Sequence, residues 1–151
     1  MTLTLIVDDA SLDPFGSTSC LNGFFSMLKP SLPTLVDIYI GCVIEGRFSF
    51  SHFDNLCHEF EKMAGQNVVE KINLMIRTFP SFDGTRLGEL DDVLMGSHED
   101  WPALRKVSLS LNIVGTSRSR DNVVEKLQES TMTKLMESNR VQFDFQVRDW
   151  R

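Results

Sequence analysis

An acidic pair, Asp8 and Asp9, directly follows a short apolar stretch near the start of the chain. Carboxylates at the end of a first parallel strand can hold Mg²⁺ for phosphoryl transfer. Such a site also needs a phospho-accepting aspartate after the third strand and a lysine after the fifth. Asp54 falls instead within a helical pattern, and no lysine follows the last apolar stretch. We therefore expect Asp8 and Asp9 to begin a solvated turn.

Histidines and cysteines are the other candidates for metal-binding or nucleophilic chemistry. They are His52, His58, His98, Cys20, Cys42 and Cys57. His52 and His58 lie six residues apart, so they do not share a helix face at one-turn spacing, and no four ligands have the spacing of a zinc site. The cysteines form no Cys-x-x-Cys pair and no even set, which is typical of buried small hydrophobic residues in a reducing compartment. No P-loop, nucleophile elbow or Gly-x-Gly-x-x-Gly motif occurs, so we expect no metal, no cofactor and no enzymatic activity.

Composition bounds the domain organisation and the partners. Because the chain has 151 residues, 42% hydrophobic content and no linker-like stretch, we expect one domain over residues 1–151. The 15 basic and 21 acidic residues give a net charge of −6 without a long run of Lys or Arg, which argues against nucleic acid as a partner. No apolar run has the length of a signal-peptide core or a membrane span. We therefore expect no membrane partner and a location in the cytoplasm or nucleus.

Short alternating apolar stretches recur along the chain every 34 or 35 residues. Their apolar residues are Leu3, Leu5 and Val7; Ile38 and Ile40; Ile72, Leu74 and Ile76; Val107, Leu109 and Leu111; and Val141, Phe143 and Phe145. The segments between them place apolar residues at helical spacing, and Leu21, Leu56 and Leu90 keep the same step. Pro33 and Pro102 stand before two of the stretches, where a proline ends a helix and favours extended geometry. The pattern predicts a strand-and-helix unit repeated about four times.

The strand stretches alternate apolar and polar residues, which indicates that helices cover only one face of the sheet. Strands between two helix layers would be continuously apolar, so a doubly wound sheet is the less favoured alternative. We predict an α/β fold, a leucine-rich-repeat-like right-handed strand/helix solenoid with a single parallel sheet of about five strands. Its strands should be centred near Leu5, Ile40, Leu74, Leu109 and Phe143, with Leu74 and Leu109 buried.

The stretch Leu87 to Ile113 combines Leu-x-x-Leu-Asp-x-Val-Leu with Trp101-Pro102-x-Leu104 and Lys106-Val107-x-Leu109-x-Leu111-x-Ile113. With these motifs the chain resembles the C-terminal repeats of the F-box-type leucine-rich-repeat proteins of mushroom-forming fungi. The closing Val141-x-Phe143-x-Phe145 is similar to that family's last strand. The resemblance implies that the repeats hold a substrate while an N-terminal F-box docks on a ubiquitin-ligase scaffold. Because the array begins at Leu3, we expect the F-box to be missing from this chain.

The polar positions of the strands form the face that the helices leave open, and this face is the candidate binding site. Its partner-binding residues are predicted to be Tyr39, Asn73, Met75, Ser108, Ser110, Gln142 and Asp144. Tyr39 and Met75 would be the apolar anchors, since aromatic residues and methionine are enriched in interface cores.

We predict a protein-binding repeat module, and the resemblance makes it a candidate for the substrate-recognition part of an F-box-type ubiquitin-ligase adaptor. The alternative is a small α/β enzyme or receiver-like domain whose site is not recognisable in the sequence. The expected partner is a protein on the open sheet face. The exposed edge of a terminal strand also offers a route to self-association.

Overall fold

The computed structural model describes residues 1–7, 23–44, 50–78, 86–114, 121, 124–125 and 132–150. In chain order its elements are β1 (Thr2–Val7), α1 (Phe24–Leu28), the 3₁₀ helix η2 (Lys29–Thr34), β2 (Asp37–Ile44), α2 (Phe50–Met63), β3 (Lys71–Thr78), α3 (Arg86–Met95), β4 (Lys106–Val114), α5 (Thr133–Met136) and β5 (Gln142–Trp150). Within these residues, none of the helices has the length and apolar character needed to cross a membrane. Asp8, Asp9 and Cys20 lie outside the described residues, so the expectation of a solvated turn stays a prediction.

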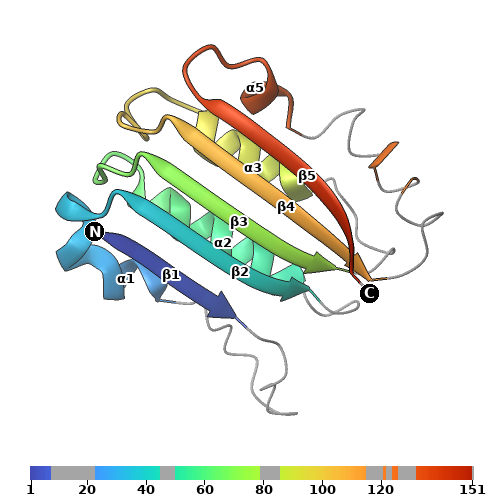
Figure 1. Cartoon of the computed structure of the whole chain (residues 1–151). Coiled ribbons are helices and arrows are strands. Elements are labelled where there is room, and N and C mark those ends of the chain that lie inside the picture. Colours follow the sequence, from blue (N-terminus) through green and yellow to red (C-terminus); the bar gives the residue numbers. More distant parts are fainter. Residues whose placement is uncertain are drawn as a thin grey trace.

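The five strands form one parallel sheet in the order β1-β2-β3-β4-β5 (Figure 1). Leu5 lies beside Ile40, Ile40 beside Leu74, and Leu74 beside Leu109. The prediction of five parallel strands in chain order is confirmed. A doubly wound sheet reverses its strand order at a switch point, so that alternative is wrong.

Helices α2 and α3 lie on the same face of the sheet (Figure 1). The burial of β3 alternates accordingly: Leu74 and Ile76 are buried, whereas Asn73 and Met75 are only partly covered. This alternation arises because successive strand side chains point to opposite faces, and in the described part of the chain α2 and α3 cover only one of them (Figure 1). The sheet therefore keeps an open face, as the sequence pattern indicates.

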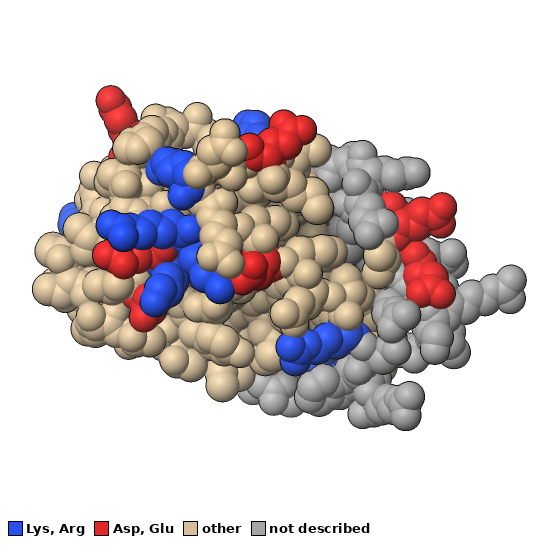
Figure 2. Space-filling model, turned by 45° about the horizontal axis from the view of Figure 1, so that its top comes forward, with Lys and Arg blue, Asp and Glu red and all other residues tan. Residues whose placement is uncertain are grey.

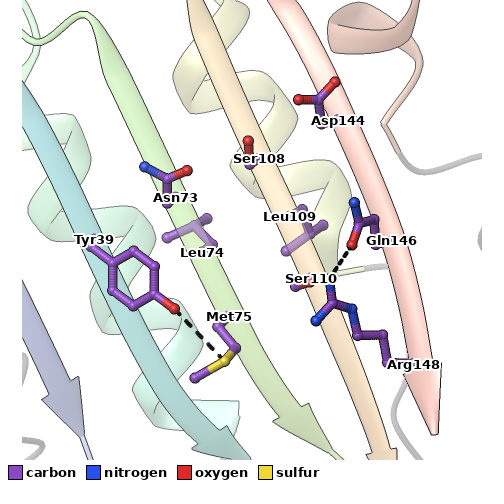
Figure 3. A pocket seen from close by; sticks show the side chains of 10 residues that line it. All are labelled: Tyr39, Asn73, Leu74, Met75, Ser108, Leu109, Ser110, Asp144, Gln146 and Arg148. Atoms are coloured by element: carbon purple, nitrogen blue, oxygen red, sulfur yellow. Dashed lines mark hydrogen bonds between the residues drawn. The ribbon is translucent and has the colours of Figure 1, made fainter.

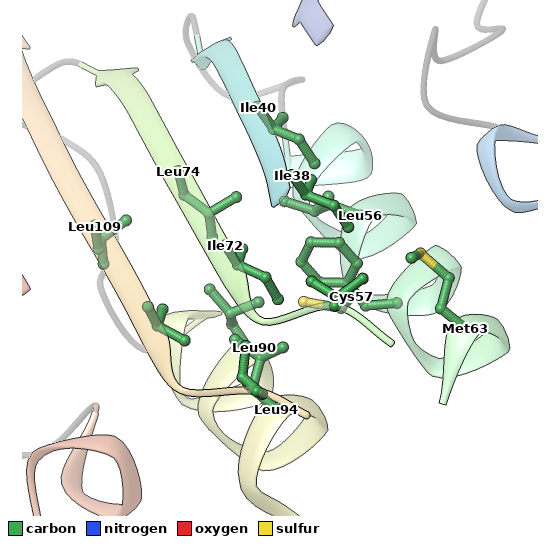
Figure 4. Packing of buried hydrophobic residues seen from close by; sticks show 14 of the residues in the cluster. Ile38, Ile40, Leu56, Cys57, Met63, Ile72, Leu74, Leu90, Leu94 and Leu109 are labelled. Atoms are coloured by element: carbon green, nitrogen blue, oxygen red, sulfur yellow. The ribbon is translucent and has the colours of Figure 1, made fainter. Parts of the chain in front are cut away.

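The hydrophobic core lies between the sheet and the helices (Figure 4). Leu74 and Leu109, which the sequence predicts to be buried, are 3% and 1% exposed. They share the core with helix residues such as Leu56 of α2. The Phe60 and Trp101 rings meet edge to face, with centroids 5.6 Å apart and an interplanar angle of 82°. This aromatic pair joins α2 to the segment before β4, and contributes about 0.5–1.5 kcal/mol beyond simple area burial.

The turn after α2 is built for a tight connection to β3. Gly65 has φ +70°, a left-handed conformation that glycine adopts without strain, and it ends the helix. The buried Asn67 side chain then donates to the carbonyl oxygens of Met63 (2.8 Å) and Asp100 (3.1 Å) and accepts from the Val69 N–H (3.2 Å). One side chain thus satisfies backbone groups of two neighbouring strand-and-helix units.

Buried carboxylates hold the ends of neighbouring helices together. The Phe25 N–H of α1 donates to Glu59 Oε2 of α2 at 2.5 Å, and the Lys62 ammonium lies 2.6 Å from Glu59 Oε1. Burial favours the neutral form of the Glu59 carboxyl, but the hydrogen bonds from Lys62 and Phe25 outweigh burial, so the pKa of Glu59 lies below its ordinary value. Asp91 of α3 plays the same part for α5, accepting two backbone N–H groups at 2.9 and 2.8 Å.

The register of β5 differs from the sequence prediction. A constant step of 34 residues places Val141 beside Val107, but the structure pairs Val107 with Phe143. The reason is that a shift of two residues keeps every side chain on its own face, so the alternation of apolar and polar residues cannot distinguish the two registers. The last strand is therefore displaced by two residues from the predicted alignment.

Candidate functional site

The open face of the sheet is hollowed by a depression of about 240 Å³ that reaches from β2 to β5 (Figure 3). Its lining residues are Tyr39, Asn73, Leu74, Met75, Ser108, Leu109, Ser110, Asp144, Gln146 and Arg148. Six of the seven residues that the sequence singles out are among them. The seventh, Gln142, lies outside the lining, but its side-chain amide donates to Asp144 at 3.2 Å. The structure thus brings the predicted residues together on adjacent strands.

Tyr39 and Met75 make one side of the depression apolar, and Ile6 lies next to them outside the lining; we call these three residues the apolar corner. The Tyr39 hydroxyl lies 3.9 Å from Met75 Sδ. The Met75 side chain leans over Gly41, where an added Cβ would lie 3.4 Å from Met75 Cε and 4.0 Å from Ile6 Cγ1. Tyr39 is 36% exposed and Ile6 is 70% exposed. A partner that covered the apolar corner would release the water on these side chains, which favours binding.

The other side of the depression is polar, and here the shifted register of β5 matters. Asp144 lies beside Ser108 instead of Ser110, and Gln142 lies beside Lys106 instead of Ser108. The Lys106 ammonium is 2.6 Å from Asp144 Oδ2, and the Gln142 amide donates to Asp144 Oδ1 at 3.2 Å. The bond from Lys106, and after it the bond from Gln142, holds the pKa of Asp144 below its ordinary value. Asp144 is therefore ionised at neutral pH, with both oxygens engaged.

Gln146 and Arg148 line the depression but are missing from the sequence prediction. Arg148 Nη2 donates to Gln146 Oε1 at 2.6 Å. Figure 3 shows the Arg148 side chain reaching from β5 towards Ser110 on β4. A signal for both residues is present in the sequence, because they flank Val147 and continue the alternation of the strand.

The charge of the open face differs in sign from that of the whole chain. Among the described strand residues, register and alternation place six charged ones on this face: Asp37, Lys71, Arg77, Lys106, Asp144 and Arg148. Four are basic and two are acidic, which gives the face +2, whereas the chain carries −6. Figure 2 shows basic and acidic side chains close together on one side of the molecule, where most other residues are uncharged.

Residues with catalytic or metal-binding potential do not gather in the part of the chain that the structure describes. No three His, Cys, Asp or Glu side chains there are arranged to hold a metal ion. His58 pairs with Glu61 at 3.3 Å on the exposed side of α2, and His98 is exposed. Cys42 and Cys57 are buried, and burial raises the pKa of the Cys42 thiol to about 12. Cys42 is therefore a neutral, poorly nucleophilic thiol at physiological pH.

Comparison with known proteins finds no relative for this chain: no protein-family model matches it, and no curated protein or solved structure does. The resemblance to F-box-type leucine-rich-repeat proteins thus stays a prediction from the sequence motifs. The structure itself shows an α/β chain whose helices alternate with the strands of one open, five-stranded parallel sheet.

Proposed function

We propose that this chain is a protein-binding module whose partner lies on the open face of the sheet. The observation that carries the proposal is the depression, where side chains from four adjacent strands converge. Exposed Tyr39 and partly covered Met75 stand beside hydroxyl, amide and charged groups, and interfaces combine such anchors with polar surroundings. Because the residues sit on paired strands, little backbone conformational entropy is lost when a partner binds.

We infer further that the sheet belongs to a leucine-rich-repeat-like, right-handed solenoid. Paired residues on successive strands are 34 to 36 positions apart, so each strand-and-helix unit has nearly the same length. Arrays of such units offer their strand surface as an extended binding face. This agrees with the position of the depression on the strands instead of the helices.

The motif resemblance supports a more specific role, recognition of the substrate of an F-box-type ubiquitin ligase. In that role an F-box of the same protein would recruit the ligase scaffold. Sequencing of the complete transcript, followed by co-precipitation of its product with the scaffold, tests this role. A complete transcript without an F-box would refute the adaptor role and leave the binding-module proposal unaffected.

The binding face is tested with Tyr39→Ala and Met75→Ala. We expect each change to reduce the recovery of captured proteins from cell extract at least about tenfold, because truncated anchors at interface centres commonly cost 2 kcal/mol or more. Quantitative mass spectrometry of the captured proteins measures the reduction, and circular dichroism checks that both variants remain folded.

Glu61→Gln is the matched control, since Glu61 lies on the exposed side of α2 and pairs only with His58 in the described residues. Lys62 is unsuitable because it pairs with the buried Glu59. Capture that depends on Glu61 and not on Tyr39 or Met75 would place the partner on the helix side and refute the proposal.

A further inference from the structure

We propose that the open face selects an acidic, extended segment of its partner, in which a Glu or Asp side chain lies within about three residues of an apolar one. This inference rests on the proposed protein-binding function and names the chemistry of the segment that is bound. It draws on three observations: the donors left over in the depression, the charge of the open face, and the distance between the apolar corner and Arg148.

Two charged side chains are among the described lining residues: Asp144 is paired with the opposite charge of Lys106, whereas Arg148 donates to the neutral Gln146. Asp144, the carboxylate among the described lining residues, already accepts from Lys106 and Gln142 with its two oxygens. The side-chain oxygen of Gln146 accepts from Arg148. The Ser108 and Ser110 hydroxyls, the Asn73 amide and the Arg148 guanidinium also line the depression and can donate to a ligand. The Ser and Asn side chains can also accept hydrogen bonds, whereas the Arg148 guanidinium only donates and carries a positive charge. A carboxylate, which accepts and carries the opposite charge, is therefore the complementary group.

The charge of the face points the same way. The described strand positions of the open face carry +2, whereas the whole chain carries −6, so this face favours an acidic segment although the net charge of the chain does not. Complementary charge of this kind orients the encounter and raises the association rate. A basic segment would be repelled by the net charge of these strand positions.

The apolar corner and Arg148 are placed to bind two neighbouring residues of one segment. Met75 is on β3 and Arg148 on β5, two strands apart, which corresponds to about 10 Å between their backbones. The Arg148 side chain reaches back over β4, which shortens the distance to its guanidinium (Figure 3). An extended segment rises about 3.3 Å per residue, so two or three residues span this distance. If an apolar residue of the segment contacts the apolar corner, an acidic residue two or three positions away can reach Arg148.

Synthetic peptides test this inference. Ten-residue, fluorescein-labelled peptides of Gly and Ser carry one Leu and, two or three positions later, Glu, Gln, Lys or phosphoserine. Fluorescence anisotropy measures each Kd for the full chain and for Arg148→Gln. We expect the Glu peptide to bind at least about tenfold more tightly than the Gln peptide, the Lys peptide to bind most weakly, and Arg148→Gln to remove most of the Glu advantage.

Lys29→Gln is the matched control, because it removes the same charge from the exposed helix η2, outside the depression. It should leave the Glu advantage intact. Equal affinity for Glu and Gln peptides, a preference for Lys, or binding that requires phosphoserine would overturn the inference, as would an Arg148→Gln variant with an unchanged preference.

The extract experiment separates this inference from the proposed function. If none of the peptides binds or none is preferred, while Tyr39→Ala and Met75→Ala still abolish protein capture, the acidic preference is wrong and the binding face stands. If the peptides fail and capture is also independent of Tyr39 and Met75, both proposals are wrong.

Discussion

Replacement of Glu59 by Gln tests the buried carboxylate that joins α1 to α2. The Glu59 side chain is 1% exposed and accepts the Phe25 N–H at 2.5 Å, while the partly exposed Lys62 lies 2.6 Å away. Gln keeps the shape and one acceptor oxygen but loses the charge on both bonds. A hydrogen bond to a buried charged group contributes about 1.5–3 kcal/mol, whereas one between neutral groups contributes about 1 kcal/mol. The ion pair with Lys62 adds less, because Lys62 is partly exposed and solvent weakens the attraction. We expect Glu59→Gln to lower the free energy of unfolding by about 2 kcal/mol at pH 7.

The loss should depend on pH in a defined direction. Because the pKa of Glu59 is lowered in the folded state, its ionised form stabilises the fold above the unfolded-state pKa, which is about 4.3, and this contribution is lost as pH falls through the folded-state pKa. The difference in the free energy of unfolding between wild type and Glu59→Gln should therefore be constant above about pH 5.5 and should shrink as the solution becomes more acidic. Urea unfolding followed by the fluorescence of the buried Trp101 measures it.

Glu61→Gln is again the control, since Glu61 is on the same helix and its side chain is 60% exposed. We expect it to change the free energy of unfolding by less than about 0.5 kcal/mol. Equal effects of the two substitutions, or a Glu59→Gln gap that persists unchanged in acid, would show that the carboxylate does not link the helices as described.

Three further predictions concern the core, the thiols and the sheet edges. Leu74→Ala and Leu109→Ala should each lower the free energy of unfolding by about 2–5 kcal/mol in urea titrations. A loss below about 1 kcal/mol would mean that the two leucines are not in the core and that the strands are placed differently. The buried Cys42 thiol, with its pKa raised to about 12, should react with a thiol reagent far more slowly in native than in unfolded protein, as mass spectrometry of labelled peptides would show, and equal rates would contradict its burial. Because β1 and β5 are the outermost strands of the sheet, each has an edge that can pair with another chain, and we expect self-association at high protein concentration. Sedimentation velocity that finds only monomer over a roughly hundredfold range of protein concentration would exclude it.

The strands and the core could be predicted because they depend on many residues at once. Each strand contributes two or three apolar positions of equal parity, and the step between strands recurs, so an error at one position is corrected by the others. Burial of Leu74 and Leu109 follows directly from their place in the central strands. Parallel pairing follows from the helical segments between strands, since parallel strands need a crossover of that length.

The helix contacts of Glu59 and Asp91 could not be predicted, because each depends on a single pairing across the chain. Glu59 stands at the border of the apolar stripe of α2, where a long charged side chain ordinarily reaches solvent. Its partner, the Phe25 N–H, lies 34 residues away. The N-cap residue of α1, Gly23, has no side chain that could accept this N–H, but the local sequence does not indicate that Glu59 supplies the acceptor instead.

The register of β5 decides which charge the open face selects. With the predicted register, Asp144 would lie beside Ser110, a further two residues along the strand from Lys106 and beyond the diagonal distance at which cross-strand side chains meet. Its carboxylate would then lack the Lys106 ammonium as a partner, and a basic ligand would complement it. In the observed register Asp144 lies beside Ser108 and diagonal to Lys106, and the two side chains meet at 2.6 Å. The Asp144 carboxylate is therefore neutralised by Lys106 of the same chain. The Arg148 guanidinium remains as a charged donor, so the face is expected to prefer an acidic ligand. A shift of two residues, which leaves the alternation of the strand unchanged, thus reverses the sign of the ligand that the face is expected to bind.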